Sequence, residues 1–169
     1  MNRFLTKKFP FFLLIPVLLS FNGVAYKANF AGNWTLNESK SELGEFGGRF
    51  SAKKIKVEQK DDAVTIAKTF PGFDGGEDRT TTEILSFDGK TLESTGFFNS
   101  KKKSTIKWSD DGNSFTITYN IVFERDGQTT EINGTETWTL SDEGKTLTLQ
   151  VASTSAQGEF KVKAAYDKS

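Results

Sequence analysis

The sequence predicts an all-β protein, an antiparallel up-and-down meander that closes into a barrel of about 8–10 strands. Two observations lead to this prediction. Beyond Ala28, apolar and polar residues alternate with a period of two over most of the chain, which places them on opposite faces of strands. Between the alternating stretches, short segments place an acidic residue before a glycine, the chemistry of tight hairpin connections. No stretch of this part carries a helical period.

The first 25 residues have the pattern of a cleaved signal peptide. Arg3, Lys7 and Lys8 precede the uncharged run 9–19, which is proline-broken and too short to span a bilayer as a stable helix. Small residues at Gly23 and Ala25 fit the positions that a signal peptidase recognises, so we expect cleavage after Ala25. A retained membrane-anchoring helix is the alternative.

Residues 26–169 are expected to form one barrel domain. Removing Arg3, Lys7 and Lys8 leaves 19 basic against 22 acidic residues, a net charge of −3, so we expect no nucleic-acid binding. The chain has no cysteine, and an exported form must therefore rely on its core, which a domain of this size is long enough to bury. After signal cleavage we do not expect an integral membrane protein. A lipid-facing band does not fit the faces that carry Lys54, Lys56, Lys161 and Lys163.

About ten strands are expected, with ends uncertain by a few residues. The clearest is 114–124, in which the odd positions from Phe115 to Phe123 are apolar and the even positions are mostly polar. The first contains Gly32-Asn33-Trp34. In chain order the expected strands lie near 30–37, 52–59, 63–70, 79–87, 91–98, 102–109, 114–124, 128–140, 145–152 and 159–166.

An up-and-down order sends the connections alternately to the two ends of the barrel. One end receives tight acidic turns, and the other receives mostly longer connections. The tight turns are Asp61-Asp62, Asp88-Gly89, Asp110-Asp111-Gly112 and Asp142-Glu143-Gly144, and the opposite connections are 38–51, 71–78, 99–100, 125–127 and 153–158. On this map Trp34, Trp108 and Trp138 cluster at the tight-turn end, where we expect them to form the floor of the core. Ligand stacking is the less favoured role for them.

The Gly32-Asn33-Trp34 motif, a long first connection that could act as a lid, and the alternation of short and long connections resemble the lipocalin-type barrels of the calycin group. Avidin-type and fatty-acid-binding barrels share the pattern. Three lipocalin features are missing: a Thr-Asp-Tyr after the sixth strand, an arginine near the end of the chain that would cover the tryptophan, and a helix after the last strand. The resemblance implies a lipocalin-like barrel over 26–169 that binds a small hydrophobic molecule.

The candidate ligand-binding residues lie toward the loop-ringed end. Tyr119, Ile121 and Phe123 share the apolar face of one strand and approach this end, and we place four further residues at the same rim: Phe70, Phe97, Phe98 and Arg79. An apolar lumen with one phenol suits a lipid or a similar molecule. A lumen filled by side chains, with no cavity, is the alternative.

Two carboxylates stand at positions that the alternation assigns to the apolar face of a strand. Glu83 shares this face with Leu85, and Glu136 shares it with Trp138. We favour an outward orientation for both, through a bulge at Gly134 or a frayed strand end. Alternatively they are buried and anchor a polar ligand head or pair with Arg79. The run Lys101-Lys102-Lys103 is expected to be a solvated edge, and with three other cations it would make part of the mouth basic: Arg49, Lys53 and Lys54.

Enzyme chemistry is poorly supported, because the chain has no histidine and no cysteine. We expect no metal and no cofactor; the acidic loop 74–78 lacks the spacing of an EF-hand. The sequence thus predicts a secreted or periplasmic barrel that binds a small hydrophobic, lipid-like ligand. The alternative function is an envelope structural or protein-interaction module without a ligand cavity.

Overall fold

The computed structural model describes residues 27–72, 75–96, 99–125 and 127–169, so the predicted signal peptide lies outside the described residues. These described residues fold into ten strands and two short helical segments. The strands are β1 (Gly32–Leu36), β2 (Lys54–Gln59), β3 (Ala63–Phe70), β4 (Arg79–Ser86), β5 (Leu92–Thr95), β6 (Lys101–Trp108), β7 (Ser114–Arg125), β8 (Gln128–Leu140), β9 (Thr146–Ser155) and β10 (Gly158–Lys168). The helical segments are η1 (Glu38–Lys40) and α1 (Gly44–Phe50).

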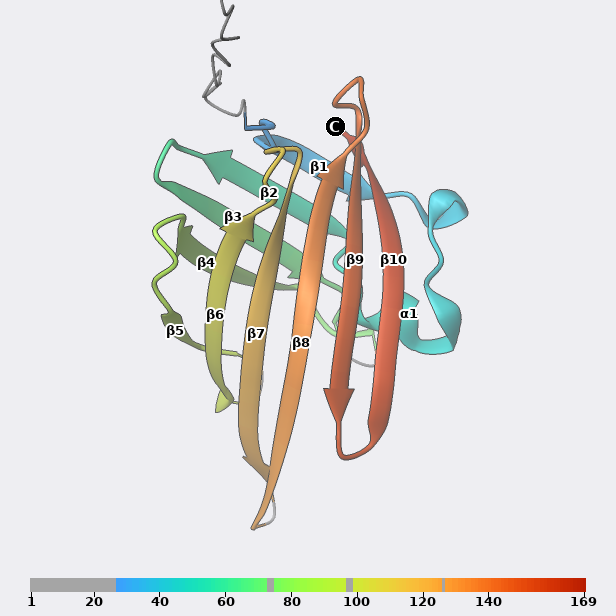
Figure 1. Ribbon diagram of the computed structural model, residues 1–169. Helices are drawn as coiled ribbons and strands as arrows, with labels where there is room; N and C mark the ends of the chain where they lie inside the picture. The colour runs from blue at the N-terminus through green and yellow to red at the C-terminus, as the bar shows by residue number, and fades with distance from the viewer. Residues whose placement is uncertain (1–26, 73–74, 97–98, 126) are drawn as a thin grey trace, which may run out of the picture.

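All ten strands form one antiparallel sheet that curls into a barrel (Figure 1). The sheet order is β4-β3-β2-β1-β10-β9-β8-β7-β6-β5, so almost every strand pairs with its sequence neighbour. The first and last strands complete the circuit, with Trp34 of β1 opposite both Ile55 of β2 and Lys168 of β10. The all-β class, the antiparallel meander and the strand number predicted from the sequence are confirmed.

The barrel is nearly, not fully, closed in its backbone. The edge strands β4 and β5 follow one another in the chain but share no hydrogen-bonded ladder. Side chains span this seam instead. Phe87 packs on Trp108 with ring centroids 5.2 Å apart, and the Glu83 carboxylate of β4 reaches across β5 to Lys102 of β6.

The first long connection, which the sequence predicted only as a possible lid, contains η1 and α1. Helix α1 is short and glycine-rich, so neither hydrophobic period nor helix propensity marks it in the sequence. Its stability comes from packing beside β10 (Figure 1). A Cβ on Gly47 would lie 3.0 Å from the Val162 side chain, so the glycine permits this close approach.

The turns confirm the predicted difference between the two ends for most connections. The Ser109 carbonyl accepts a backbone hydrogen bond from Gly112 at 3.0 Å, and the Ser141 carbonyl accepts one from Gly144 at 2.8 Å. Both glycines have positive φ angles, +71° and +65°, which explains the recurring acidic-glycine motif. One connection was predicted wrongly: β9 runs to Ser155 and β10 begins at Gly158, so the expected loop 153–158 is a tight hairpin.

An aromatic cluster fills the tight-turn end. Phe115 lies edge-on to Phe30 at 4.6 Å and stacks on Trp138 at 5.4 Å, and Trp108 contacts both Phe30 and Phe115. Trp34, also buried, donates its indole N–H to the Phe30 carbonyl at 3.0 Å. The three tryptophans therefore belong to the core, as predicted. Within the described part of the chain, no helix is both long and apolar enough to cross a bilayer.

Candidate ligand-binding site

Burial of the lumen-facing side chains decreases from the tight-turn end toward the loop-ringed end, which we call the mouth. Along β7, Phe115 and Ile117 are sealed at 0% and 1% exposure, Tyr119 is 9% exposed, and Ile121 and Phe123 are only half-buried. The other long strands repeat this order: on β10 the buried Tyr166 is followed toward the mouth by Ala164, Val162 and finally the half-buried Phe160. The side chains near the mouth are therefore partly exposed to solvent, whereas those at the tight-turn end are sealed.

Half-way along the lumen lie two buried ion pairs, which we call the lumenal charge cluster: Lys68, Glu83, Lys102 and Glu136. Lys68 of β3 donates to Oε2 of Glu136 on β8 at 2.5 Å, and both side chains are about one-tenth exposed, at 10% and 11%. The indole N–H of Trp138 donates to the same oxygen at 3.3 Å. Burial raises the pKa of Glu136, but the charges of Lys68 and Lys102 outweigh it, and the pKa lies below its usual value. Glu136 is thus held as a carboxylate.

The second pair joins the two sides of the seam. Lys102 of β6 donates to Glu83 of β4 at 2.7 Å, with side chains 15% and 14% exposed, and the Ser104 hydroxyl donates to the other carboxylate oxygen at 3.4 Å. The Lys102 ammonium also lies 5.3 Å from the centre of the Tyr119 ring, within range of a cation–π contact. This pair replaces the missing backbone ladder at mid-height.

Two phenols flank the cluster. Burial, and to a lesser extent the negative charge of Glu136, raises the pKa of Tyr119 to about 12, although a hydrogen bond with Ser153 acts to lower the pKa. Burial and the same carboxylate also raise the pKa of Tyr166, which lies deeper. The buried hydroxyl of Tyr166 has no hydrogen-bond partner among the described residues. Both phenols are therefore neutral at physiological pH and can serve as hydroxyl donors.

The favoured outward orientation of Glu83 and Glu136 is wrong. Strand β8 has no bulge at Gly134, which lies directly between Tyr119 of β7 and Ser153 of β9 in an unbroken register. The glycine instead makes room for the phenol, since a Cβ there would lie 2.5 Å from the Tyr119 hydroxyl. The alternation of inward and outward side chains is therefore unbroken, and both carboxylates point inward.

Two further predictions are corrected at the lumenal charge cluster: the partner of Glu83, and the solvated edge formed by the lysine run 101–103. Glu83 pairs with Lys102, whereas Arg79 was the partner considered from the sequence. Lys101 and Lys103 are exposed, as expected of an edge, but Lys102 points inward between them. The expectation of an apolar lumen with one phenol is therefore wrong at mid-height, where the inward face is charged. The alternation of inward and outward side chains along β6 could have predicted the inward orientation of Lys102, but the run of three lysines obscured this pattern.

The structure brings most of the predicted ligand-binding residues to the mouth half. Tyr119, Ile121 and Phe123 face inward along β7, and Phe70 and Arg79 lie opposite one another in the β3–β4 ladder, both half-buried. Phe97 and Phe98 lie outside the described residues.

At the rim, Lys53 pairs with both oxygens of Asp78 at 2.9 Å. This partly neutralises the expected basic mouth, and the Lys53 hydrogen bond lowers the pKa of Asp78. The described part of the acidic loop and the rest of the described chain contain no group of three or more acidic side chains arranged to hold a metal ion.

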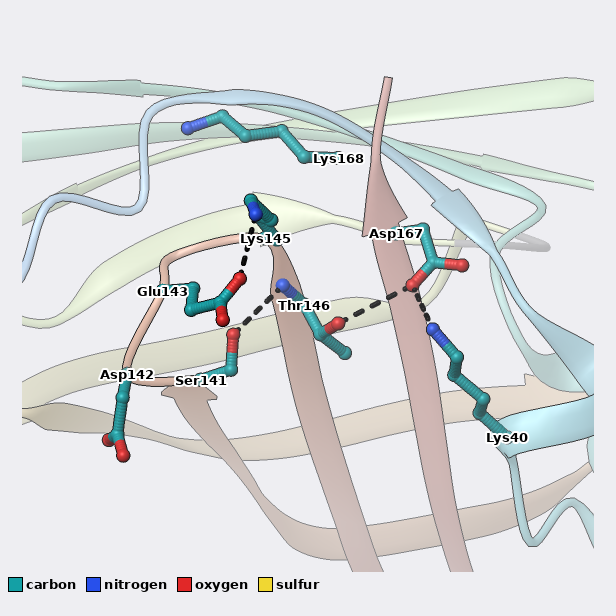
Figure 2. A pocket seen from close by; sticks show the side chains of 8 residues that line it. All are labelled: Lys40, Ser141, Asp142, Glu143, Lys145, Thr146, Asp167 and Lys168. Atoms are coloured by element: carbon teal, nitrogen blue, oxygen red, sulfur yellow. Dashed lines mark hydrogen bonds and ion pairs between the residues drawn. The ribbon is translucent and has the colours of Figure 1, made fainter.

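Two surface pockets lie outside the lumen. Figure 2 shows the first, beside the β8–β9 turn, where Lys145 pairs with Glu143 and Asp167 accepts hydrogen bonds from Lys40 and Thr146. Its lining is balanced between three lysines and three acidic residues, so it selects no ligand charge. The second lies over the outward face of β1–β4 and is lined by Asn33, Trp34, Thr35, Lys54, Ile55, Lys56, Ala67, Thr69, Thr80 and Ser169. Neither includes a predicted ligand-binding residue.

Comparisons with known proteins found a similar solved structure and no matching sequence family. No protein-family model matches the sequence, and no curated protein matches it. Among solved structures, the chain is similar to zebrafish ileal bile acid-binding protein, crystallised with cholic acid, with a TM-score of 0.48 and 18% sequence identity over 83% of this chain and 98% of that one. The strand order of the barrel itself confirms the antiparallel up-and-down meander on which the lipocalin-like prediction rests.

Proposed function

We propose that this protein is an exported barrel, secreted or periplasmic, that binds a small hydrophobic, lipid-like molecule through its mouth. The observation that supports this most directly is the gradient of burial along the lumen. A sealed aromatic floor lies at one end, and half-buried apolar side chains such as Ile121 and Phe123 lie at the other. Apolar walls accessible from one side are the setting in which small apolar ligands bind.

The half-buried apolar residues come from β3 and from β7 to β10, so the apolar surface spans several strands. They include Phe70 on β3, Ile132 on β8, Val151 on β9 and Phe160 on β10. The only exposed large apolar side chains among the described residues are Phe50 and Ile84, at 53% and 62%. The apolar contact area available to a ligand is therefore concentrated inside the mouth. The proposal is of a carrier and not an enzyme.

The test is binding of the neutral apolar dye N-phenyl-1-naphthylamine, followed by displacement with a lipid panel. Ile121→Glu places a charge on the inward wall of the mouth, and Thr118→Glu places the same charge on the exposed outward face of the same strand. We expect the first variant to weaken dye binding at least tenfold and the second to leave it unchanged. Urea unfolding of both variants confirms that they are folded.

If the wild-type protein binds neither dye nor lipid, the account as a carrier is wrong and the envelope interaction module becomes the better account. Equal loss of binding in both variants would show that the dye binds elsewhere. Export is tested separately: N-terminal sequencing of the protein recovered outside the cytoplasm is expected to begin at Tyr26, after cleavage at Ala25. A chain that retains its first 25 residues in the membrane fraction would contradict it.

A further inference from the structure

We propose that the polar end of the ligand is uncharged, a hydroxyl, carbonyl or amide group, and that it binds at the lumenal charge cluster with the apolar body directed toward the mouth. This inference deepens the proposed function and rests on it. It follows from how the buried charges of the lumen are already paired.

The four members of the cluster neutralise one another. Lys68 pairs with Glu136 and Lys102 with Glu83, so two ammonium groups face two carboxylates in the same section of the lumen. Their direct partners in the β-ladders are uncharged: Ile55 and Thr81 beside Lys68, Ile66 beside Glu83, Ser94 and Ile121 beside Lys102, and Ile117 and Val151 beside Glu136. The cluster itself is polar but carries no net charge.

Arg79 also faces inward. It is four residues from Glu83 on β4, about 13 Å along a strand, but its ladder partner Phe70 is only two residues from Lys68 on β3. The Arg79 side chain is itself engaged in an interaction, so it is not an unpartnered cation beside the cluster.

An anionic group at the cluster would be the third negative charge beside two ammonium groups. It would have to share Lys68 or Lys102 with a buried glutamate, and a buried charge without its own partner is strongly unfavourable. The favourable cationic partners of the cluster are already used by Glu136 and Glu83, at 2.5 and 2.7 Å.

An uncharged polar group meets no such cost. Each lysine ammonium has three donors, and the hydrogen bonds between described residues use one donor of Lys68 and one of Lys102. The Oε1 atom of Glu136 is an acceptor beside them, and the neutral phenol of Tyr119 is both donor and acceptor. A ligand hydroxyl can donate to a carboxylate and accept from an ammonium, and a carbonyl can accept from the remaining donors.

The test compares two ligands of equal chain length that differ in the charge of the head. Displacement of N-phenyl-1-naphthylamine by 1-dodecanol and by dodecanoate is measured at neutral pH with the full mature protein. We expect the alcohol to bind at least tenfold more tightly than the carboxylate. An equal or tighter affinity for dodecanoate overturns the inference while leaving the proposed function intact. Failure of the dye and both ligands to bind overturns both.

Substitutions in the cluster test its charge balance. Glu136→Gln removes one negative charge and leaves an unpaired ammonium, so the preference is expected to move toward dodecanoate by at least tenfold. Glu83→Gln is a second, independent variant that predicts the same shift through Lys102. The matched control is Glu159→Gln, which makes the same change on the exposed outward face of β10, where Glu159 pairs with Lys161. Equal shifts in the control, or no shift in either folded cluster variant, would overturn the inference.

Discussion

Replacing Lys68 tests whether the buried ion pair is coupled as the structure shows. In Lys68→Met the Glu136 carboxylate, whose side chain is 11% exposed, loses its 2.5 Å partner. Loss of one partner from a buried pair costs about 3–5 kcal/mol. We expect a value near the lower end, about 3 kcal/mol, because the Trp138 N–H and the charge of Lys102 still stabilise the carboxylate. Glu136→Gln leaves Lys68 unpaired and is expected to cost about as much.

The double variant Lys68→Met/Glu136→Gln removes both charges and keeps an acceptor for Trp138. Its destabilisation is expected to fall short of the sum of the two single variants by about 2 kcal/mol or more, because neither charge is left unpaired. Urea unfolding at neutral pH measures all three variants. Lys161→Met, in an exposed pair with Glu159, is the control and should leave the unfolding midpoint unchanged. Additive single-variant effects would refute the coupling.

Three further outcomes are expected. Gly134→Ala places a Cβ 2.5 Å from the Tyr119 hydroxyl and 2.8 Å from the Ala152 carbonyl oxygen, and should cost about 1–3 kcal/mol in urea unfolding; an unchanged midpoint would contradict this packing. Phe115→Ala, at a fully buried position, should cost about 3–5 kcal/mol, and a loss below about 1 kcal/mol would exclude its place in the aromatic floor. The pKa of Glu136 in the folded protein lies below its usual 4.5, so the ionised carboxylate stabilises the fold fully above pH 4.5 and loses this effect as the pH falls through the folded pKa. The difference in unfolding free energy between wild type and Glu136→Gln should therefore shrink in acid. A difference that stays constant with pH would contradict the lowered pKa.

The strands and their order were predictable because two local rules agree over most of the chain. Alternation marks β7 so clearly that its ends were predicted to within one residue, and β3 and β8 match the expected 63–70 and 128–140. The acidic-glycine turns fixed which connections are tight. Since consecutive strands in such a meander pair with one another, local order determined the global topology.

The charge cluster was not predictable in the same way, because a carboxylate at an inward position is costly unless a partner lies nearby. That partner is distant in sequence: Glu136 and Lys68 are separated by 68 residues and meet only across the lumen of the barrel. Helix α1 was missed for a related reason, since its contacts with β10 and not its own sequence stabilise it. Both errors concern features that only the tertiary fold creates.

Native mass spectrometry of the exported protein, purified without detergent and followed by organic extraction, tests the central claim most directly. The account predicts a stoichiometric adduct whose extracted component is a small apolar molecule with an uncharged polar end. A mass of the apo protein alone, together with no binding of any member of a lipid panel, would contradict the proposed carrier.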